Sequence, residues 1–240
     1  MATKRRTPAK AKSPLLKKIT GILTKVFLWF LMVTVLWVLF YRFVNPPITL
    51  LMIQRNIERS SDDKPGKMEK KWVDFDDMSD NMKRAAVSAE DQLFLKHIGF
   101  DVKAIEKAFE TNKKGKKIKG GSTISQQTAK NVFLWPGRSW IRKGFEAYFT
   151  LLIEIFWSKE RILEVYLNVI EMGDGIYGAE AASQAYYGKS CTKLSRAQAA
   201  LIASCFPNPR RWSPKNATPY IRHRQYLIMK NMRRLGPLDF

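Results

Sequence analysis

The stretch Gly120-Gly121-Ser122-Thr123-Ile124-Ser125-Gln126-Gln127 joins a glycine turn to the start of a helix, which we expect Ser122 to cap. A helix start presents unpaired N–H groups and the positive end of the helix dipole, which together favour a bound anion. An ordinary capped helix after a flexible loop has the same local sequence. The doubled glutamine, and the pair Lys130-Asn131 one turn further along, favour a ligand-binding role instead.

The helical pattern extends from Ser79 almost to the end of the chain, with apolar residues recurring at spacings of three and four. Ser195-x-x-Gln198 is a capping box, Asp101 can cap the second expected helix, and Gly188 is placed to end the sixth. The fold class is therefore expected to be all-α, with one domain over residues 72–240. The expected helices span 81–96, 102–111, 123–133, 141–157, 159–171, 178–187, 196–205 and 219–235.

The amino terminus has the pattern of a membrane anchor. Residues 1–18 contain lysine and arginine but no acidic residue, and Val26–Tyr41 then runs without a charge. Flanking apolar residues extend this run toward the ~30 Å of a bilayer core, so we expect a transmembrane helix over 19–44. The positive-inside rule leaves residues 1–18 in the cytoplasm and the rest across the membrane. A cleaved signal peptide is the alternative, but the apolar run is too long and no small-residue cleavage site follows.

The formal net charge of +21 indicates a polyanionic partner: nucleic acid, anionic lipid or a phosphorylated substrate. A membrane anchor argues against nucleic acid. Residues 45–71 are expected to form a short juxtamembrane helix over 48–57 and then a polar linker. The two cysteines, Cys191 and Cys205, are too few for a disulfide framework and are expected to be free thiols, although the sequence does not decide whether they pair.

Glu90-Asp91 is the first candidate for acid–base chemistry, because apolar residues surround it on both sides. Partial desolvation would raise the pKa of a carboxyl group there and suit it as a base. The alternative is a solvated acidic pair on the outer face of a helix. The basic run Lys113–Lys119 leads into the glycine turn and adds to the proposed anion site. His97 and His223 lack metal-ligand spacing and are expected to be structural.

Glu160, Glu164 and Asn168 follow one another at spacings of four on one face of an expected helix. Two interpretations fit this spacing. The face is either an exposed salt-bridge surface or a buried, hydrogen-bonded brace for neighbouring helices. Periodicity alone does not separate them.

Five motifs in order resemble the peptidoglycan glycosyltransferases of family 51, in particular the members without a penicillin-binding domain. The similarity covers about residues 72–235, and its last motif is the loosest because His223 stands where an arginine is common. The motifs are Glu90-Asp91-Gln92-Leu93-Phe94 with His97-x-Gly99, Gly121-Ser122-Thr123-x-x-Gln126-Gln127-x-x-Lys130-Asn131, Arg142-Lys143-x-x-Glu146, Arg161-Ile162-Leu163-Glu164-x-Tyr166-Leu167-Asn168, and Arg224 followed by Leu227-Ile228.

The resemblance implies a lysozyme-like helical head with a small hydrophobic jaw, which polymerises lipid II into β-1,4-linked glycan strands and releases polyprenyl diphosphate. It implies that Glu90 is the general base for the acceptor hydroxyl and that Glu146 is a second catalytic carboxylate near the departing diphosphate. The implied substrate-binding residues are Ser122, Thr123, Gln126, Gln127, Lys130, Asn131, Arg138, Arg142 and Lys143. The implied supporting residues are Asp91, Glu164, Asn168 and Arg224.

The resemblance also implies the cellular setting. The protein is expected in the bacterial inner (cytoplasmic) membrane, single-pass, with a periplasmic catalytic domain and no transpeptidase region. No cofactor or metal site is expected, with Mg²⁺ or Mn²⁺ left open as an aid to diphosphate departure. The expected partners are lipid II, the growing glycan strand, membrane lipids and cell-division or elongation proteins. Two other functions are weighed against this one: a lysozyme-like lytic enzyme that cleaves glycan strands, and a non-enzymatic anchored scaffold.

Overall fold

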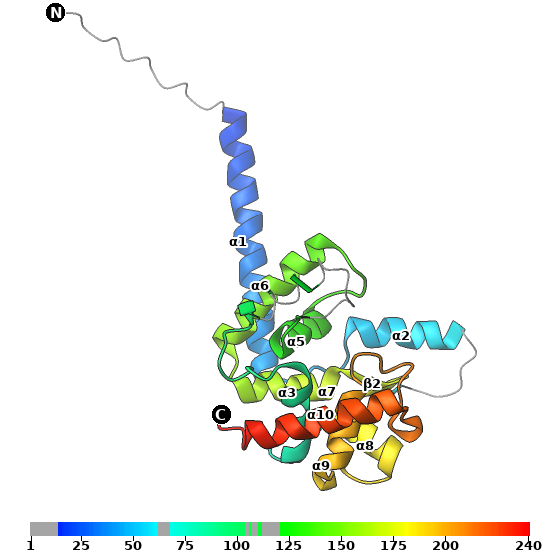
Figure 1. Cartoon of the computed structure of the whole chain (residues 1–240). Helices are drawn as coiled ribbons and strands as arrows, with labels where there is room; N and C mark the ends of the chain where they lie inside the picture. Colours follow the sequence, from blue (N-terminus) through cyan, green and yellow to red (C-terminus); the bar gives the residue numbers. More distant parts are fainter. Residues whose placement is uncertain (1–13, 62–67, 104–105, 107–109, 112–120) are drawn as a thin grey trace, which may run out of the picture.

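The protein consists of one long helix that projects from a helical head (Figure 1). The computed structural model describes residues 14–61, 68–103, 106, 110–111 and 121–240. The projecting helix, α1 (Pro14–Phe43), contains a segment, Lys17–Phe43, that is long and apolar enough to cross a membrane. The other helices are α2 (Leu50–Ser61), α3 (Asp80–Glu90), α5 (Ile124–Phe133), α6 (Trp140–Phe156), α7 (Lys159–Val169), α8 (Ala179–Tyr187), α9 (Arg196–Ser204) and α10 (Pro219–Leu235).

Helices dominate the described residues, which confirms the all-α class, but a small sheet is present as well. Its strands are β1 (Glu69–Lys70), β2 (Glu171–Gly173) and β3 (Ile176–Tyr177), in the order β1-β3-β2. β1 runs parallel to β3, and β2 runs antiparallel to it. The predicted linker over 58–71 is therefore wrong at both ends, because α2 continues to Ser61 and residues 69–70 pair in the sheet.

Several predicted helix boundaries are confirmed. Gly188 ends α8 in the left-handed conformation, Ser195 and Gln198 form the capping box of α9, and α10 spans 219–235 as expected. Half of the predicted helix 102–111 lies outside the described residues, and the described residues 102, 103, 106, 110 and 111 are helical.

Two predicted helices end earlier than expected. The helix expected over 81–96 stops at Glu90, because Asp91 turns its carboxylate toward the start of α5. The helix expected over 159–171 stops at Val169, and Glu171 enters strand β2 instead. After that strand pair the chain passes very close to α7 at Gly178, where φ is +85° and an added Cβ would lie 2.9 Å from the backbone oxygen of Asn168.

Helix α1 is packed against the head along one side, next to α6 (Figure 1). The Trp37 ring meets the rings of Phe133 and Phe149 edge-on, with centroids 5.3 and 6.1 Å away. The Trp157 indole N–H donates to the backbone oxygen of Val38 at 2.8 Å, and Thr34 Oγ1 lies 2.7 Å from the Tyr148 hydroxyl. The anchor is thus part of the hydrophobic core of the head as well as an apolar helix.

Arg161 fixes the carboxyl-terminal end of α1. Its guanidinium donates to the backbone oxygens of Tyr41 and Val44 at 2.9 and 3.0 Å, and to Asn45 Oδ1 at 2.8 Å. These oxygens have no partner inside the helix, so an arginine beside them satisfies an otherwise unpaired helix end. Arg161 also pairs with Glu164 at 2.8 Å, which ties α7 to the anchor.

Asn168 decides between the two interpretations of the 160–168 face. Its side chain is fully buried and exchanges two hydrogen bonds of 2.9 Å with the backbone N–H and C=O of Val73. Asn168 and Glu164 therefore belong to a buried brace, because a hydrogen-bonded amide in the core holds two segments in a fixed register. Glu160 lies in the first turn of α7 and is exposed.

Candidate active site

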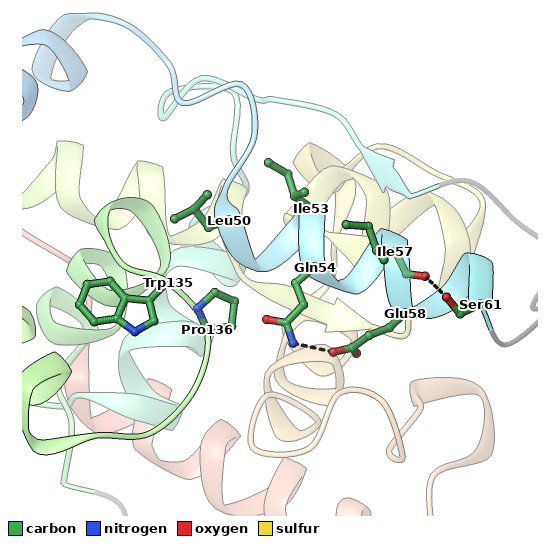
Figure 2. Close-up of a pocket in the computed structure, with 8 residues that line it drawn as sticks. All are labelled: Leu50, Ile53, Gln54, Ile57, Glu58, Ser61, Trp135 and Pro136. Carbon is green, nitrogen blue, oxygen red and sulfur yellow. Dashed lines mark hydrogen bonds between the residues drawn. The ribbon is translucent and has the colours of Figure 1, made fainter.

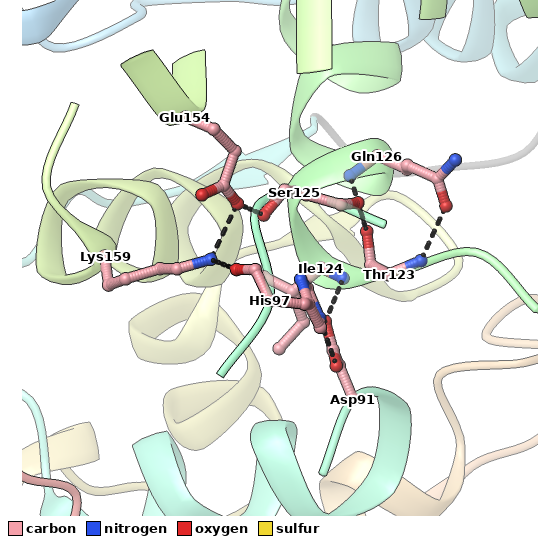
Figure 3. Close-up of polar contacts among 9 residues, drawn as sticks. Asp91, His97, Thr123, Ile124, Ser125, Gln126, Glu154 and Lys159 are labelled. Atoms are coloured by element: carbon pink, nitrogen blue, oxygen red, sulfur yellow. Dashed lines mark hydrogen bonds and ion pairs between the residues drawn. The ribbon is translucent and has the colours of Figure 1, made fainter. Parts of the chain in front are cut away.

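The start of α5 is held by Thr123 and Asp91 (Figure 3). Thr123 and Gln126 form a capping box, in which Thr123 Oγ1 accepts the Gln126 N–H and Gln126 Oε1 accepts the Thr123 N–H. The Asp91 carboxylate accepts the next N–H, that of Ile124, at 3.0 Å. The prediction that Ser122 caps this helix is therefore wrong by one residue. Ser122 is instead exposed beside the helix start.

Asp91 also lies 2.9 Å from His97 Nε2, so a buried carboxylate joins the end of α3, the following turn and the start of α5. The turn comes close to α6 at Gly99, where φ is +77° and a Cβ would lie 2.6 Å from Thr150. Thr123 Oγ1 donates to the Gly99 backbone oxygen at 2.6 Å. The predicted structural role of His97 and the supporting position of Asp91 both follow from these contacts.

Glu154 and Lys159 hold the same turn through hydrogen bonds (Figure 3), although no local sequence pattern identified them. The buried Glu154 carboxylate accepts a hydrogen bond from Ser125 Oγ and one from Lys159 Nζ, the latter at 2.8 Å. Lys159 Nζ also donates to the backbone oxygen of His97 at 2.7 Å. A polar network thus holds the turn and the first part of α5 together.

A cleft of about 370 Å³ opens between the end of α3 and the start of α5. Two of the sequence motifs, which lie about 30 residues apart, therefore share one cavity. Its wall includes Glu90, Asp91, Lys103, Gly121, Ser122 and Thr123.

Glu90 is the carboxylate best placed for proton transfer. Gln127 Nε2 donates to Glu90 Oε2 at 2.7 Å. Burial raises the pKa of the Glu90 carboxyl, and the hydrogen bond from Gln127 and the positive charges of Arg224 and Lys130 partly oppose that rise. A carboxylate whose pKa is raised is a stronger proton acceptor, which suits it as a general base.

Glu146 belongs to α6, and its charge acts on Lys130. Its carboxylate is buried, and Lys143 Nζ lies 2.5 Å from its Oε1. Burial lowers the pKa of Lys130, and the charges of Glu146 and Glu90 act against that shift. The charges of both carboxylates thus influence one cation, Lys130.

The remaining predicted cations have different surroundings. Arg142 Nε donates to the backbone oxygen of Trp135 at 2.7 Å, and Arg142 and Lys143 both influence the pKa of Lys130. Arg138 is exposed in the loop between α5 and α6. Arg224 Nε donates to the Ser204 backbone oxygen at 3.2 Å, which ties α10 to α9 on the Glu90 side of the cleft.

Three of the predicted substrate-binding residues are buried and contribute to the structure of α5. Thr123 and Gln126 are buried and form the capping box, and Asn131 is buried in the last turn of α5. Ser122 lines the cleft together with Thr123, and Gln127 reaches its wall through the hydrogen bond to Glu90. The predicted basic run Lys113–Lys119 lies outside the described residues.

Among residues 14–61, 68–103 and 121–240, no group of three or more His, Cys, Asp or Glu side chains is arranged to hold a metal ion. Cys191 and Cys205 are both buried free thiols, as predicted. Burial raises the pKa of Cys191 to about 12, so its thiol stays protonated and unreactive at neutral pH.

Sequence comparisons agree with this geometry. The profile of the family described as Transglycosylase matches residues 57–233. Proteins named biosynthetic peptidoglycan transglycosylase from Pseudomonas fluorescens and Ectopseudomonas mendocina are 48% and 47% identical to the chain, over 91% and 92% of both partners. A protein of the same name from Stutzerimonas stutzeri is 49% identical over 89% of this chain and 88% of its own. These similarities show that the chain belongs to the transglycosylase family.

Proposed function

We propose that this protein polymerises lipid II into β-1,4-linked glycan strands of peptidoglycan and releases polyprenyl diphosphate. The observation that carries the proposal is the Glu90 carboxylate in the cleft wall, held by the hydrogen bond from Gln127, with the charge of Lys130 acting on it and on the buried Glu146. The relatives' names support the same reaction, since they match this chain over about nine-tenths of its length.

The proposed reaction is an inverting displacement. Glu90 takes the proton from the 4-hydroxyl of the acceptor sugar, and the resulting oxygen attacks the anomeric carbon of the donor as the bond to the diphosphate breaks. The role resembles that of the base in inverting glycosidases, except that a sugar hydroxyl replaces water. Negative charge develops on the diphosphate oxygen, where Lys130, Arg142 and Lys143 stabilise the transition state more than the ground state. Glu146 orients Lys143 toward that charge.

The proposed setting is the bacterial inner membrane, crossed once by α1, with residues 1–13 in the cytoplasm and the head on the periplasmic side. Lipid II, the growing strand and membrane lipids are the partners that this setting provides, together with proteins of cell division or elongation. We assign strand polymerisation without peptide cross-linking, because the relatives' names describe transglycosylases alone.

The decisive experiment measures polymer formation from fluorescent lipid II by the full chain in detergent, with and without a chelator of divalent cations. The variant Glu90→Gln should lose activity by at least about 10³-fold while keeping its fold, because an amide cannot accept the proton. A Glu90→Gln variant with wild-type turnover would exclude this residue as the base. Unchanged activity with the chelator would show that the cations of α5 and α6 suffice. Loss that Mg²⁺ or Mn²⁺ restores would assign part of the charge stabilisation to a metal ion.

Two controls separate the competing functions. A lytic enzyme would release soluble fragments from purified sacculi, whereas the proposed transferase releases none because its cationic site is built for a diphosphate. An anchored scaffold would tolerate Glu146→Gln, whereas the transferase should lose several orders of magnitude in rate, since the ion pair between the exposed Lys143 and the buried Glu146 carboxylate is broken.

A further inference from the structure

A second hollow, the α2 groove, lies between α2 and the segment that follows α5 (Figure 2). Its volume is about 660 Å³. Leu50, Ile53 and Ile57 form one wall at helical spacing, and Trp135 and Pro136 form the facing wall. Gln54, Glu58 and Ser61 also line the groove, but most of its lining surface is apolar.

The α2 groove is held in shape by contacts on the other side of α2. Met52 is fully buried in the core, and Arg59 pairs with Asp174 at 2.7 Å. The bend between α1 and α2 is fixed by Lys70 Nζ, which donates to the backbone oxygens of Pro46 and Pro47 at 2.6 and 2.7 Å. The exposed apolar residues of α2 therefore belong to a rigid wall rather than to a loosely attached helix.

One end of the α2 groove adjoins the cations of the active site. The backbone oxygen of Trp135 accepts the hydrogen bond from Arg142, and the Trp135 ring contacts Phe145 of α6 at 5.9 Å. Arg142 and Lys143 in turn act on Lys130. Trp135 thus forms a wall of the apolar groove while its own backbone contacts the proposed diphosphate site.

An apolar channel that continues from a cluster of cations fits an amphiphile with an anionic head and a hydrocarbon chain. We propose that the α2 groove binds the isoprene units next to the diphosphate of the departing polyprenyl diphosphate, with the diphosphate at Lys130, Arg142 and Lys143. This inference rests on the proposed function, because that reaction supplies the ligand. Only six residues separate the end of α1 from the start of α2, so the groove opens where the chain leaves the membrane and the polyprenyl tail can reach the bilayer.

Charged substitutions in the α2 groove test the proposal. In the full-length protein, Ile53→Asp and Ile57→Asp should raise KM at least about tenfold for lipid II with an undecaprenyl chain, since a carboxylate in the groove removes apolar contact equivalent to a few methylenes. KM for a lipid II analogue whose diphosphate carries a methyl group in place of the isoprene chain should stay unchanged. Ile48→Asp is the matched control, because Ile48 is similarly exposed just before α2 but does not line the groove.

The outcomes separate the polyprenyl chain from other occupants. An equal rise in KM for both substrates would overturn the proposal. The same rise in KM in Ile48→Asp would also overturn it, because it would show that α2 acts only by adsorbing to the membrane. Unchanged KM for both substrates in both groove variants would overturn it too.

Photolabelling provides a readout that needs no turnover. A polyprenyl diphosphate with a diazirine on its first isoprene units should label peptides that contain residues 50–61 and 135–136. Equal labelling by a diazirine-bearing phosphatidylcholine, or labelling confined to other peptides, would overturn the proposal. A wild-type protein that is labelled in the α2 groove but forms no polymer would refute the proposed reaction and leave the binding site standing.

Discussion

Glu90 combines two influences that act in opposite directions. Burial disfavours its charged form, whereas Gln127 and two nearby cations favour it. The balance leaves a carboxyl group with a raised pKa beside a cleft, which is the setting of many catalytic bases. The hydrogen bond from Gln127 is the part of this balance that a single substitution can remove.

Gln127→Leu should therefore raise the pKa of Glu90 further, because the lost hydrogen bond favoured the ionised form. A base works only when it is ionised, so activity falls as the pH drops through its pKa. The acidic limb of the pH–rate profile should move to higher pH, with activity at the high-pH plateau least affected. Measurement of kcat/KM as a function of pH, from the acidic limb to the plateau, checks this.

The matched control is Gln184→Leu, which removes a similar amide-to-carboxylate hydrogen bond, that between Gln184 and Glu180 on α8. Its acidic limb should coincide with that of the wild type. A Gln127→Leu limb that stays in place, or moves to lower pH, would contradict the role assigned to this hydrogen bond.

The start of α5 is the element on which the cleft depends. Thr123 and Asp91 accept hydrogen bonds from its first N–H groups. Gly121 and Ser122, which precede the cap, line the cleft. Ser122, one residue earlier, can thus face a ligand. The division of work between neighbouring hydroxyl groups predicts different effects for their removal.

Thr123→Ala should lower the free energy of unfolding by about 1–2 kcal/mol, because it removes the cap of α5 and the hydrogen bond to Gly99. Ser122→Ala should change it by less than about 0.5 kcal/mol, as is usual for an exposed position. Denaturant unfolding of both variants in one detergent measures the difference. Equal destabilisation, or a larger effect in Ser122→Ala, would show that the cap is shared or misassigned.

The sequence predicted most helices because their apolar periodicity is long and local. It failed where a single side chain has a distant partner. Asp91 ends α3 early because it bonds to Ile124, 33 residues away, and no local pattern contains that information. The supporting contacts of Glu154 and Lys159 were not predicted for the same reason. Their partners, Ser125 and His97, are 29 and 62 residues away in the sequence. The motifs identified residues of the cleft wall such as Glu90. They did not show that Asp91, Thr123 and Gln126 satisfy the backbone N–H groups at the start of α5.

At the scale of the whole molecule, the anchor and the head share one core. Trp37 is about one-third exposed and meets two rings of the head, whereas Trp29 is two-thirds exposed and lies on the open side of α1. Both are tryptophans of the same apolar helix. They therefore form a matched pair for measuring how much the anchor stabilises the head.

Trp37→Ala should lower the stability of the detergent-solubilised protein by about 1–3 kcal/mol, less than the ~3–5 kcal/mol of a fully buried tryptophan because the ring is partly exposed. Trp29→Ala should leave it nearly unchanged. Thermal unfolding of the head, followed in the same micelles, checks both. Identical melting curves for the two variants would mean that α1 is only a tether.

The clamp of Arg161 on the last carbonyls of α1 has a consequence for the product. A head that could swivel freely about its anchor would let the polymer emerge in any direction. With this rotation blocked, the head keeps one height and one tilt relative to the bilayer at every turnover. The growing saccharide then leaves the head in one direction relative to the membrane plane. The orientation of newly made wall material would then depend in part on the contact that Arg161, at the start of α7, makes with the end of α1.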